Sequence, residues 1–96
     1  MQLAPEIAAR REQIAEVARR HGAKAVRVFG SVARGTAAPG SDLDLLISLD
    51  SQRSLIDLIA IKQELEDLLG RRVDVVTEAA LSPYIRDEVL REAVAI

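Results

Sequence analysis

Two aspartates one residue apart, Asp42 and Asp44, are the residues of this sequence whose type and spacing most clearly indicate chemistry. They stand at the start of an apolar run that reads as a β-strand, so their side chains share one face of that strand. Two carboxylates that close repel each other, which raises the pKa of one of them unless a cation lies between them. Oxygen ligands without a neighbouring His or Cys favour Mg²⁺. The alternative is a solvated pair at a strand end, with no role in chemistry.

A third aspartate, Asp74, lies among valines in the segment RRVDVVT, which is also expected to be a strand. An unpaired charge in a buried strand is costly, so a partner is expected for it. If this strand lies beside the first, three carboxylates converge and can hold two divalent ions, an arrangement suited to phosphoryl displacement. The alternative is a surface ion pair between Asp74 and Arg71 or Arg72.

The segment GSVARG precedes these strands and offers groups that can bind phosphate. Its glycines and small residues allow backbone N–H groups to approach a polyphosphate. Ser31 can donate a hydroxyl hydrogen bond to a phosphate oxygen, and Arg34 can neutralise charge there. The spacing of Gly30 and Gly35 approaches that of a Walker A loop, but the next residue is Thr36 rather than Lys, which argues against a P-loop NTPase.

The elements that must position these residues follow from hydrophobic periodicity and from capping residues. The order expected is helix, strand, glycine-rich loop, strand, helix, strand, helix. Ser54 and Asp57 form a capping pair before the second helix, and Ser82 with Pro83 opens the last one. The expected ranges are helix 5–21, strand 25–30, loop 30–35, strand 42–48, helix 55–69, strand 71–77 and helix 83–93. The sequence therefore predicts an α/β (α+β) fold, a small mixed sheet flanked by helices, in a single domain spanning residues 1–96.

Composition excludes several classes of function. The chain has 96 residues, a net charge of −2 and interspersed charges, so neither a general nucleic-acid binder nor direct nucleic-acid contact is expected. Only 2% of residues are aromatic, which leaves little for base stacking. There is no cysteine and one histidine, so disulfides, thiolate chemistry and zinc sites are not expected. No signal pattern or membrane span is expected either, and the sequence is therefore interpreted as that of a cytoplasmic protein.

The combination of Gly30-Ser31, then Asp42-x-Asp44, then a strand aspartate resembles the signature of the DNA polymerase β-like nucleotidyltransferase superfamily. The small size and the Ala33-Arg34-Gly35 and Ser41-Asp42 details resemble its minimal nucleotidyltransferase branch, the MNT or MntA-type antitoxins.

This resemblance implies roles for six residues and a reaction. Gly30, Ser31 and Arg34 would bind the triphosphate of ATP; Asp42, Asp44 and Asp74 would be the catalytic metal ligands, with two Mg²⁺ ions, and Asp74 would also help activate the attacking hydroxyl. The implied reaction transfers AMP from ATP to a hydroxyl, expected to be that of a tyrosine, on a HEPN-domain ribonuclease toxin, which is thereby neutralised.

Two other functions remain open from the sequence. The chain could be a binding module that masks the toxin without catalysis, or a nucleotidyltransferase for a small-molecule hydroxyl. Little of the chain is left over to build a pocket for a small acceptor, which disfavours the last of these.

Overall fold

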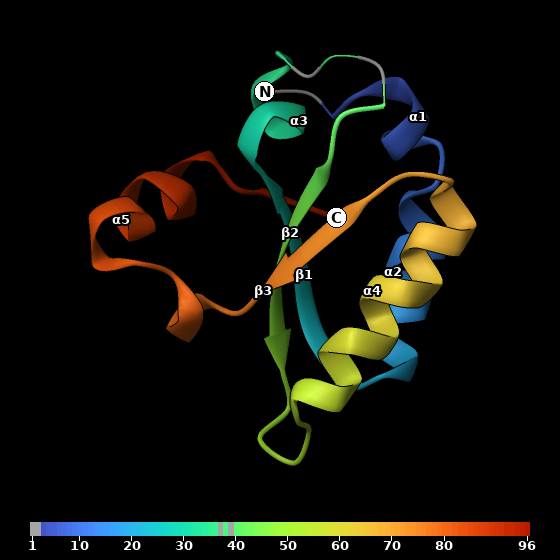
Figure 1. Ribbon diagram of the computed structural model, residues 1–96, viewed down its shortest axis with the longest axis vertical. Coiled ribbons are helices and arrows are strands. Elements are labelled where there is room, and N and C mark those ends of the chain that lie inside the picture. Colours follow the sequence, from blue (N-terminus) through green and yellow to red (C-terminus); the bar gives the residue numbers. More distant parts are fainter. Residues whose placement is uncertain (1–2, 37, 39) are drawn as a thin grey trace.

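Four strands form one mixed sheet with helices on both faces (Figure 1). The computed structural model describes residues 3–36, 38 and 40–96. The strand order is β3-β2-β1-β4; β1 is antiparallel to β2 and β4, whereas β2 and β3 are parallel. The strands are β1 Ala23–Phe29, β2 Leu43–Leu49, β3 Val73–Val76 and β4 Val94–Ala95. The predicted small mixed sheet flanked by helices is confirmed.

The helices are divided between the two faces of this sheet (Figure 1). α1, α2 and α4 cover one face, α5 and the short 3₁₀ helix η1 lie on the other, and α3 follows directly from β1. Their bounds are α1 Pro5–Ala8, α2 Arg11–Arg20, α3 Gly30–Arg34, α4 Leu55–Leu69, η1 Glu78–Ala80 and α5 Pro83–Glu92. Among the described residues, no helix is long and apolar enough to cross a membrane.

Alternating side chains of β2 supply the cores on both faces. Leu43, Leu45 and Ile47 are buried in the larger core, against residues of α2, α4 and the other strands. Leu46 points the other way and packs with Leu81 and Val89 beneath α5. This alternation was predicted from the sequence. It places the side chain of Asp44, two residues before Leu46, on the α5 side of the sheet.

Capping residues begin the two long helices on either side of β3, as the sequence predicts. The Ser54 side chain caps α4, and the Ser54 N–H donates to Asp57 Oδ2 at 3.0 Å, which completes a capping box. Ser82 Oγ accepts from the Tyr84 N–H at 3.2 Å, with Pro83 as the first residue of α5.

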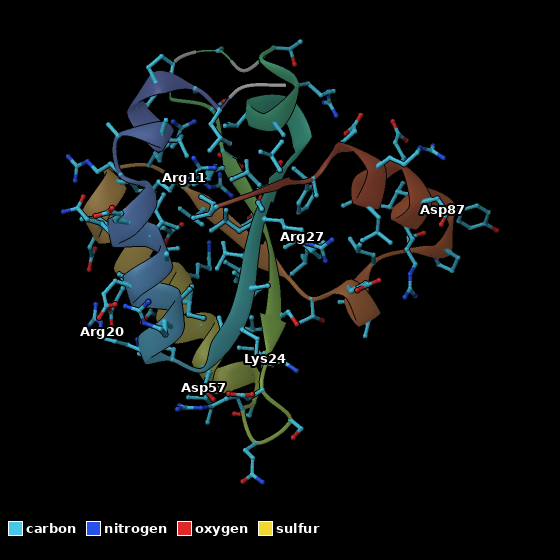
Figure 2. The ribbon with its side chains drawn as sticks, turned by 180° about the vertical axis from the view of Figure 1, so that it is seen from behind. Arg11, Arg20, Lys24, Arg27, Asp57 and Asp87 are labelled. Atoms are coloured by element: carbon cyan, nitrogen blue, oxygen red, sulfur yellow. The ribbon has the colours of Figure 1, made fainter. Side chains whose placement is uncertain are left out.

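η1 is joined to the sheet by Arg27 of β1, whose Nη2 lies 4.0 Å from Glu78 Oε2 (Figure 2).

The predicted loop over residues 30–35 is instead a single helical turn, α3. The turn buries Val32 and Ala33 in the larger core and ends at Gly35, which has a φ of +76°. The Thr36 N–H donates to the Ser31 carbonyl at 3.0 Å and closes the turn. A turn this short has no hydrophobic period that could be recognised in the sequence, so burial of its two apolar residues was not anticipated.

Two other predictions differ from the structure near the chain ends. The helix expected over residues 5–21 is interrupted at Arg10, whose backbone (φ −106°, ψ 11°) is not helical, and it forms α1 and α2. The last helix ends at Glu92, because Ala93 is extended and the next two residues pair with β1 as β4. A two-residue strand carries no sequence pattern and exists only because β1 offers it an edge.

Candidate active site

Asp44 and Asp74 are direct partners across the parallel β2–β3 ladder, and Phe29 of β1 is the partner of Asp44 on its other side. Directly paired residues point to the same face of a sheet, so the two carboxylates lie together on the α5 side. The strands of Asp44 and Asp74 are therefore adjacent, as expected, and the two residues are paired directly.

Asp74 is exposed, whereas the sequence had suggested a buried position. β3 is an edge strand only four residues long. α5 packs over Leu46, two residues further along β2 than Asp44, the partner of Asp74. In the described part of the chain neither Arg71 nor Arg72 forms an ion pair with Asp74; their carboxylate partners are Glu6 and Asp42. The surface ion pair considered as an alternative for Asp74 is thus not observed.

The pKa of the Asp44 carboxyl is raised above its usual range, first by burial. The negative charges of Asp74 and Asp42 raise it further, as does a hydrogen bond with Asp74, and the positive charge of Arg34 lowers it. A second positive charge close to Asp44 would therefore favour its ionised form.

Asp42 lies just before β2, beside the turn that leads into β3. Its Oδ1 is 3.9 Å from Arg72 Nε, and its side chain is half-buried. The N–H of the next residue, Leu43, donates to the Arg72 carbonyl at 3.0 Å. The α4–β3 turn thus lies beside Asp42. The negative charge of Asp42 in turn acts on the Asp44 carboxyl.

The donor set of this site suits a hard divalent cation. All three acidic side chains offer carboxylate oxygens, which Mg²⁺ and similar ions prefer. Within residues 3–36, 38 and 40–96, no three His, Cys, Asp or Glu side chains are already placed to ligate one ion. The fit is therefore one of chemistry and charge: the mutual repulsion that raises the pKa of Asp44 is what a bound cation would offset.

Gly30 lies directly against Asp44. Its φ is +74°, and a Cβ at this position would meet Asp44 Oδ2. A side chain here would strain the backbone and force the Asp44 carboxylate to move. This close approach places Gly30 next to the Asp44 carboxylate, and the partly exposed Ser31 follows it in the chain; both are among the three residues predicted to bind nucleotide.

Arg34 connects this site to α5. Its Nη1 donates to Glu92 Oε2 at 3.1 Å, and its charge acts on the Asp44 carboxyl. Three of the six predicted site residues thus lie in α3 after β1, and the other three lie at the start of β2 and in the neighbouring β3. Glu92, at the end of α5, was not identified from the sequence, since only the packing of α3 against α5 brings it to Arg34.

A glycine turn with a basic side chain, set against strand carboxylates on a mixed sheet, is the arrangement of a nucleotidyltransferase. A family model described as a nucleotidyltransferase domain matches residues 10–96. The chain belongs to this family and to its minimal, MntA-type branch.

Three relatives show the likeness in detail. A candidate protein adenylyltransferase of Methanocaldococcus jannaschii is 38% identical over 90% of this chain and 92% of its own length. Protein adenylyltransferase MntA of Thermococcus cleftensis is 41% identical over 84% of this chain and 82% of its own. A solved structure of a candidate minimal nucleotidyltransferase is 52% identical, with a TM-score of 0.84 over 94% of this chain and 92% of that one.

More distant solved structures share the fold. One is a toxin–antitoxin structure with AMP-PNP, at 21% identity and a TM-score of 0.75 over 96% of this chain and 72% of that one. Another is a tri-AMPylated Shewanella oneidensis HEPN toxin in complex with an MNT antitoxin, at 18% identity and a TM-score of 0.69 over 92% of this chain and 69% of that one.

Proposed function

We propose that this chain transfers AMP from ATP to a hydroxyl group of a HEPN ribonuclease toxin and thereby neutralises the toxin. The observation that carries the proposal is the pairing of Asp44 with Asp74, with the charge of Asp42 acting on Asp44, next to the turn at Gly30. Support for a protein acceptor comes from relatives named as protein adenylyltransferases and from the fold's occurrence in complexes with HEPN toxins. We propose a tyrosine as the acceptor residue.

Each site residue has a role in this proposal. The Gly30 backbone and the Ser31 hydroxyl bind the triphosphate of ATP, and Arg34 offsets its charge. Asp42, Asp44 and Asp74 are the ligands for two Mg²⁺ ions. When bound, the metal supplies charge stabilisation to the attacking and leaving oxygens.

The reaction is an in-line displacement at the α-phosphorus. The acceptor hydroxyl oxygen forms a bond to that phosphorus, the bond from the α-phosphorus to the bridging oxygen of the β-phosphate breaks, and pyrophosphate leaves. The Asp74 carboxylate accepts the proton of the hydroxyl. Its exposure on an edge strand supports an acceptor that is carried on another protein, because such a group can reach it without a pocket in this chain.

The test uses α-labelled ATP, Mg²⁺ and the product of the adjacent gene, which we expect to be a HEPN protein. Label on the HEPN protein, absent with γ-labelled ATP, supports AMP transfer. The double variant Asp42→Asn/Asp44→Asn should lose the label, whereas Asp87→Asn, a matched change on the outer side of α5 (Figure 2), should keep it.

Other results would replace the proposal. Stable binding and inhibition of the HEPN protein without any label would indicate an antitoxin that works by masking. Transfer of label only to a small-molecule hydroxyl, such as that of an antibiotic, would indicate a different acceptor class.

A further inference from the structure

The Arg71 side chain is only 9% exposed, although it lies in a short turn between α4 and β3. A buried guanidinium is costly unless several acceptors compensate it. The contacts of Arg71 therefore indicate why a charge is kept at this position.

Most of these contacts are made to one residue, Ser41. Arg71 Nε donates to the Ser41 carbonyl oxygen at 3.0 Å, Nη2 donates to the same oxygen, and Nη2 lies 3.4 Å from Ser41 Oγ. On its other side Nη1 lies 3.6 Å from Glu6 Oε1, a carboxylate of α1 that offsets the charge. Two donors on one carbonyl use the fork of the guanidinium, which an ammonium group cannot reproduce.

The Ser41 carbonyl belongs to the peptide unit that joins Ser41 to Asp42. The peptide unit after Asp42 is also bonded, since the Leu43 N–H donates to the Arg72 carbonyl at 3.0 Å. Asp42 itself precedes the first residue of β2, so the sheet ladder does not begin until after it. Two adjacent residues of one turn, Arg71 and Arg72, thus bond the backbone on both sides of Asp42.

We propose that Arg71 is a positioning residue, which holds the Ser41–Asp42 peptide unit so that the Asp42 carboxylate remains beside Asp44 for binding a divalent cation. The inference rests on the proposed function, because it assigns Asp42 to the metal site. Arg71 touches neither substrate nor metal in this scheme and acts only through Asp42.

A general anchor of the fold is the competing explanation, and the chain offers a matched control for it. Arg10 Nη1 also donates to a backbone carbonyl, that of Leu68 near the end of α4, at 3.3 Å. Its bond joins the N-terminal segment to α4 but touches nothing beside Asp42. Loss of this contact should affect stability without affecting the metal site.

The first experiment titrates Mn²⁺ into ¹⁵N-labelled protein and follows paramagnetic broadening of the backbone amide signals of residues 42–44. In Arg71→Met we expect half-maximal broadening to need about 10- to 100-fold more Mn²⁺, the usual cost of losing a group that orients a metal ligand. Arg71→Lys should recover part of this loss, and Arg10→Met should match the parent. Unchanged Mn²⁺ affinity in folded Arg71→Met, or an equal loss in Arg10→Met, would overturn the inference.

The second experiment needs no variant and remains decisive if Arg71→Met does not fold. Hydrogen exchange of the parent should show the Arg71 Nε–H, which donates to the Ser41 carbonyl, exchanging much more slowly than the Nε–H of an exposed arginine such as Arg91. Exchange of the Arg71 Nε–H at the rate of the exposed arginine would show that this side chain does not hold the Ser41–Asp42 peptide unit, which overturns the inference. Failure of the parent to bind Mn²⁺ at residues 42–44 would instead overturn the metal site of the proposed function.

Discussion

Asp44 and Asp74 face each other as direct partners of a parallel ladder, and this register places two carboxylates side by side at the edge of the sheet. Residues that are paired across a ladder point to the same face of the sheet, so the two carboxylates leave the sheet next to each other and their charges repel. Burial of Asp44 adds to the cost of this repulsion. The site is therefore electrostatically unfavourable until a cation is bound, and several consequences can be measured.

Replacing Asp44 by Asn should abolish transfer and also stabilise the metal-free protein. The carboxylate is lost as a ligand, so we expect a decrease in activity of at least about 100-fold, the scale for removing one electrostatic stabiliser of a transition state. The amide carries no charge to be buried beside Asp74 and Asp42, so the melting temperature in EDTA should increase. Activity assays and thermal denaturation check the two effects.

Asp67→Asn, an exposed change on α4, is the control for this pair of measurements. It should leave both quantities near those of the parent. A lower melting temperature for Asp44→Asn in EDTA would contradict the charge repulsion inferred at the site.

The stabilising effect of Asp44→Asn should increase with pH. Because the pKa of Asp44 is raised in the native state, the native protein binds this proton more tightly than the unfolded chain does. The associated stability is fully present below the ordinary pKa of an aspartate and is lost as the pH rises through the raised value. The lowered pKa values of Asp57, Glu64 and Glu66 act in the opposite direction, so the quantity to follow is the difference between variant and parent.

The titration of Asp44 should shift in opposite directions in two variants. Removing the negative charge in Asp74→Asn should lower the pKa of Asp44, and removing the positive charge in Arg34→Ala should raise it. The carboxyl ¹³C signal of Asp44, followed by NMR against pH without metal, gives both shifts. Asp87→Asn should cause none; shifts of the same sign in the two site variants would exclude the proposed electrostatics.

Gly30→Ala should be more damaging than the same change at Gly70. Both glycines have positive φ values, +74° and +65°, so both variants carry about 1–2 kcal/mol of backbone strain. Only at Gly30 would the new Cβ meet another group, Asp44 Oδ2, whereas at Gly70 no described atom beyond the adjoining residues lies within 4 Å of the Cβ. We therefore expect Gly30→Ala alone to lose transfer activity, even at temperatures where both variants are folded.

Denaturant unfolding of the two variants separates strain from contact. The free energy of unfolding should decrease in both, and the additional decrease in Gly30→Ala measures the displacement of Asp44. Equal activity in both would mean that the Asp44 carboxylate can move away without loss of function.

The Arg34–Glu92 pair should matter for ATP rather than for stability. Exposed ion pairs contribute about 0–1 kcal/mol, so neither Arg34→Ala nor Glu92→Gln should change the melting temperature much. Because Arg34 is proposed to offset phosphate charge, Arg34→Ala should raise the KM for ATP by about 10-fold, which corresponds to a lost charge-assisted hydrogen bond. Steady-state kinetics check this. Glu92→Gln keeps the Arg34 guanidinium and should not raise the KM for ATP. An unchanged KM in Arg34→Ala would exclude the proposed role of Arg34 in offsetting phosphate charge.

Local signals in the sequence determined much of the fold. The capping box of Ser54 and Asp57, the Ser82-Pro83 start of α5 and the alternation along β2 involve residues close together in the chain, and all three predictions are confirmed. The Gly30-Ser31 and Asp42-x-Asp44 signature was likewise readable, because residue type and spacing carry it. It identified the family before any packing was known.

Only the tertiary structure decided how these groups meet. Three contacts join residues 30 or more positions apart in the chain: Asp44 with Asp74, Arg34 with Glu92, and Arg71 with Ser41. The exposure of Asp74 likewise follows from the place of its short strand at the edge of the sheet. Such contacts depend on strand order and helix packing, which are set by the whole chain at once because they must bury the apolar side chains and leave few buried charges unpaired. The sequence by itself therefore determined which residues could do chemistry, and the packed sheet decided which of them act on one another.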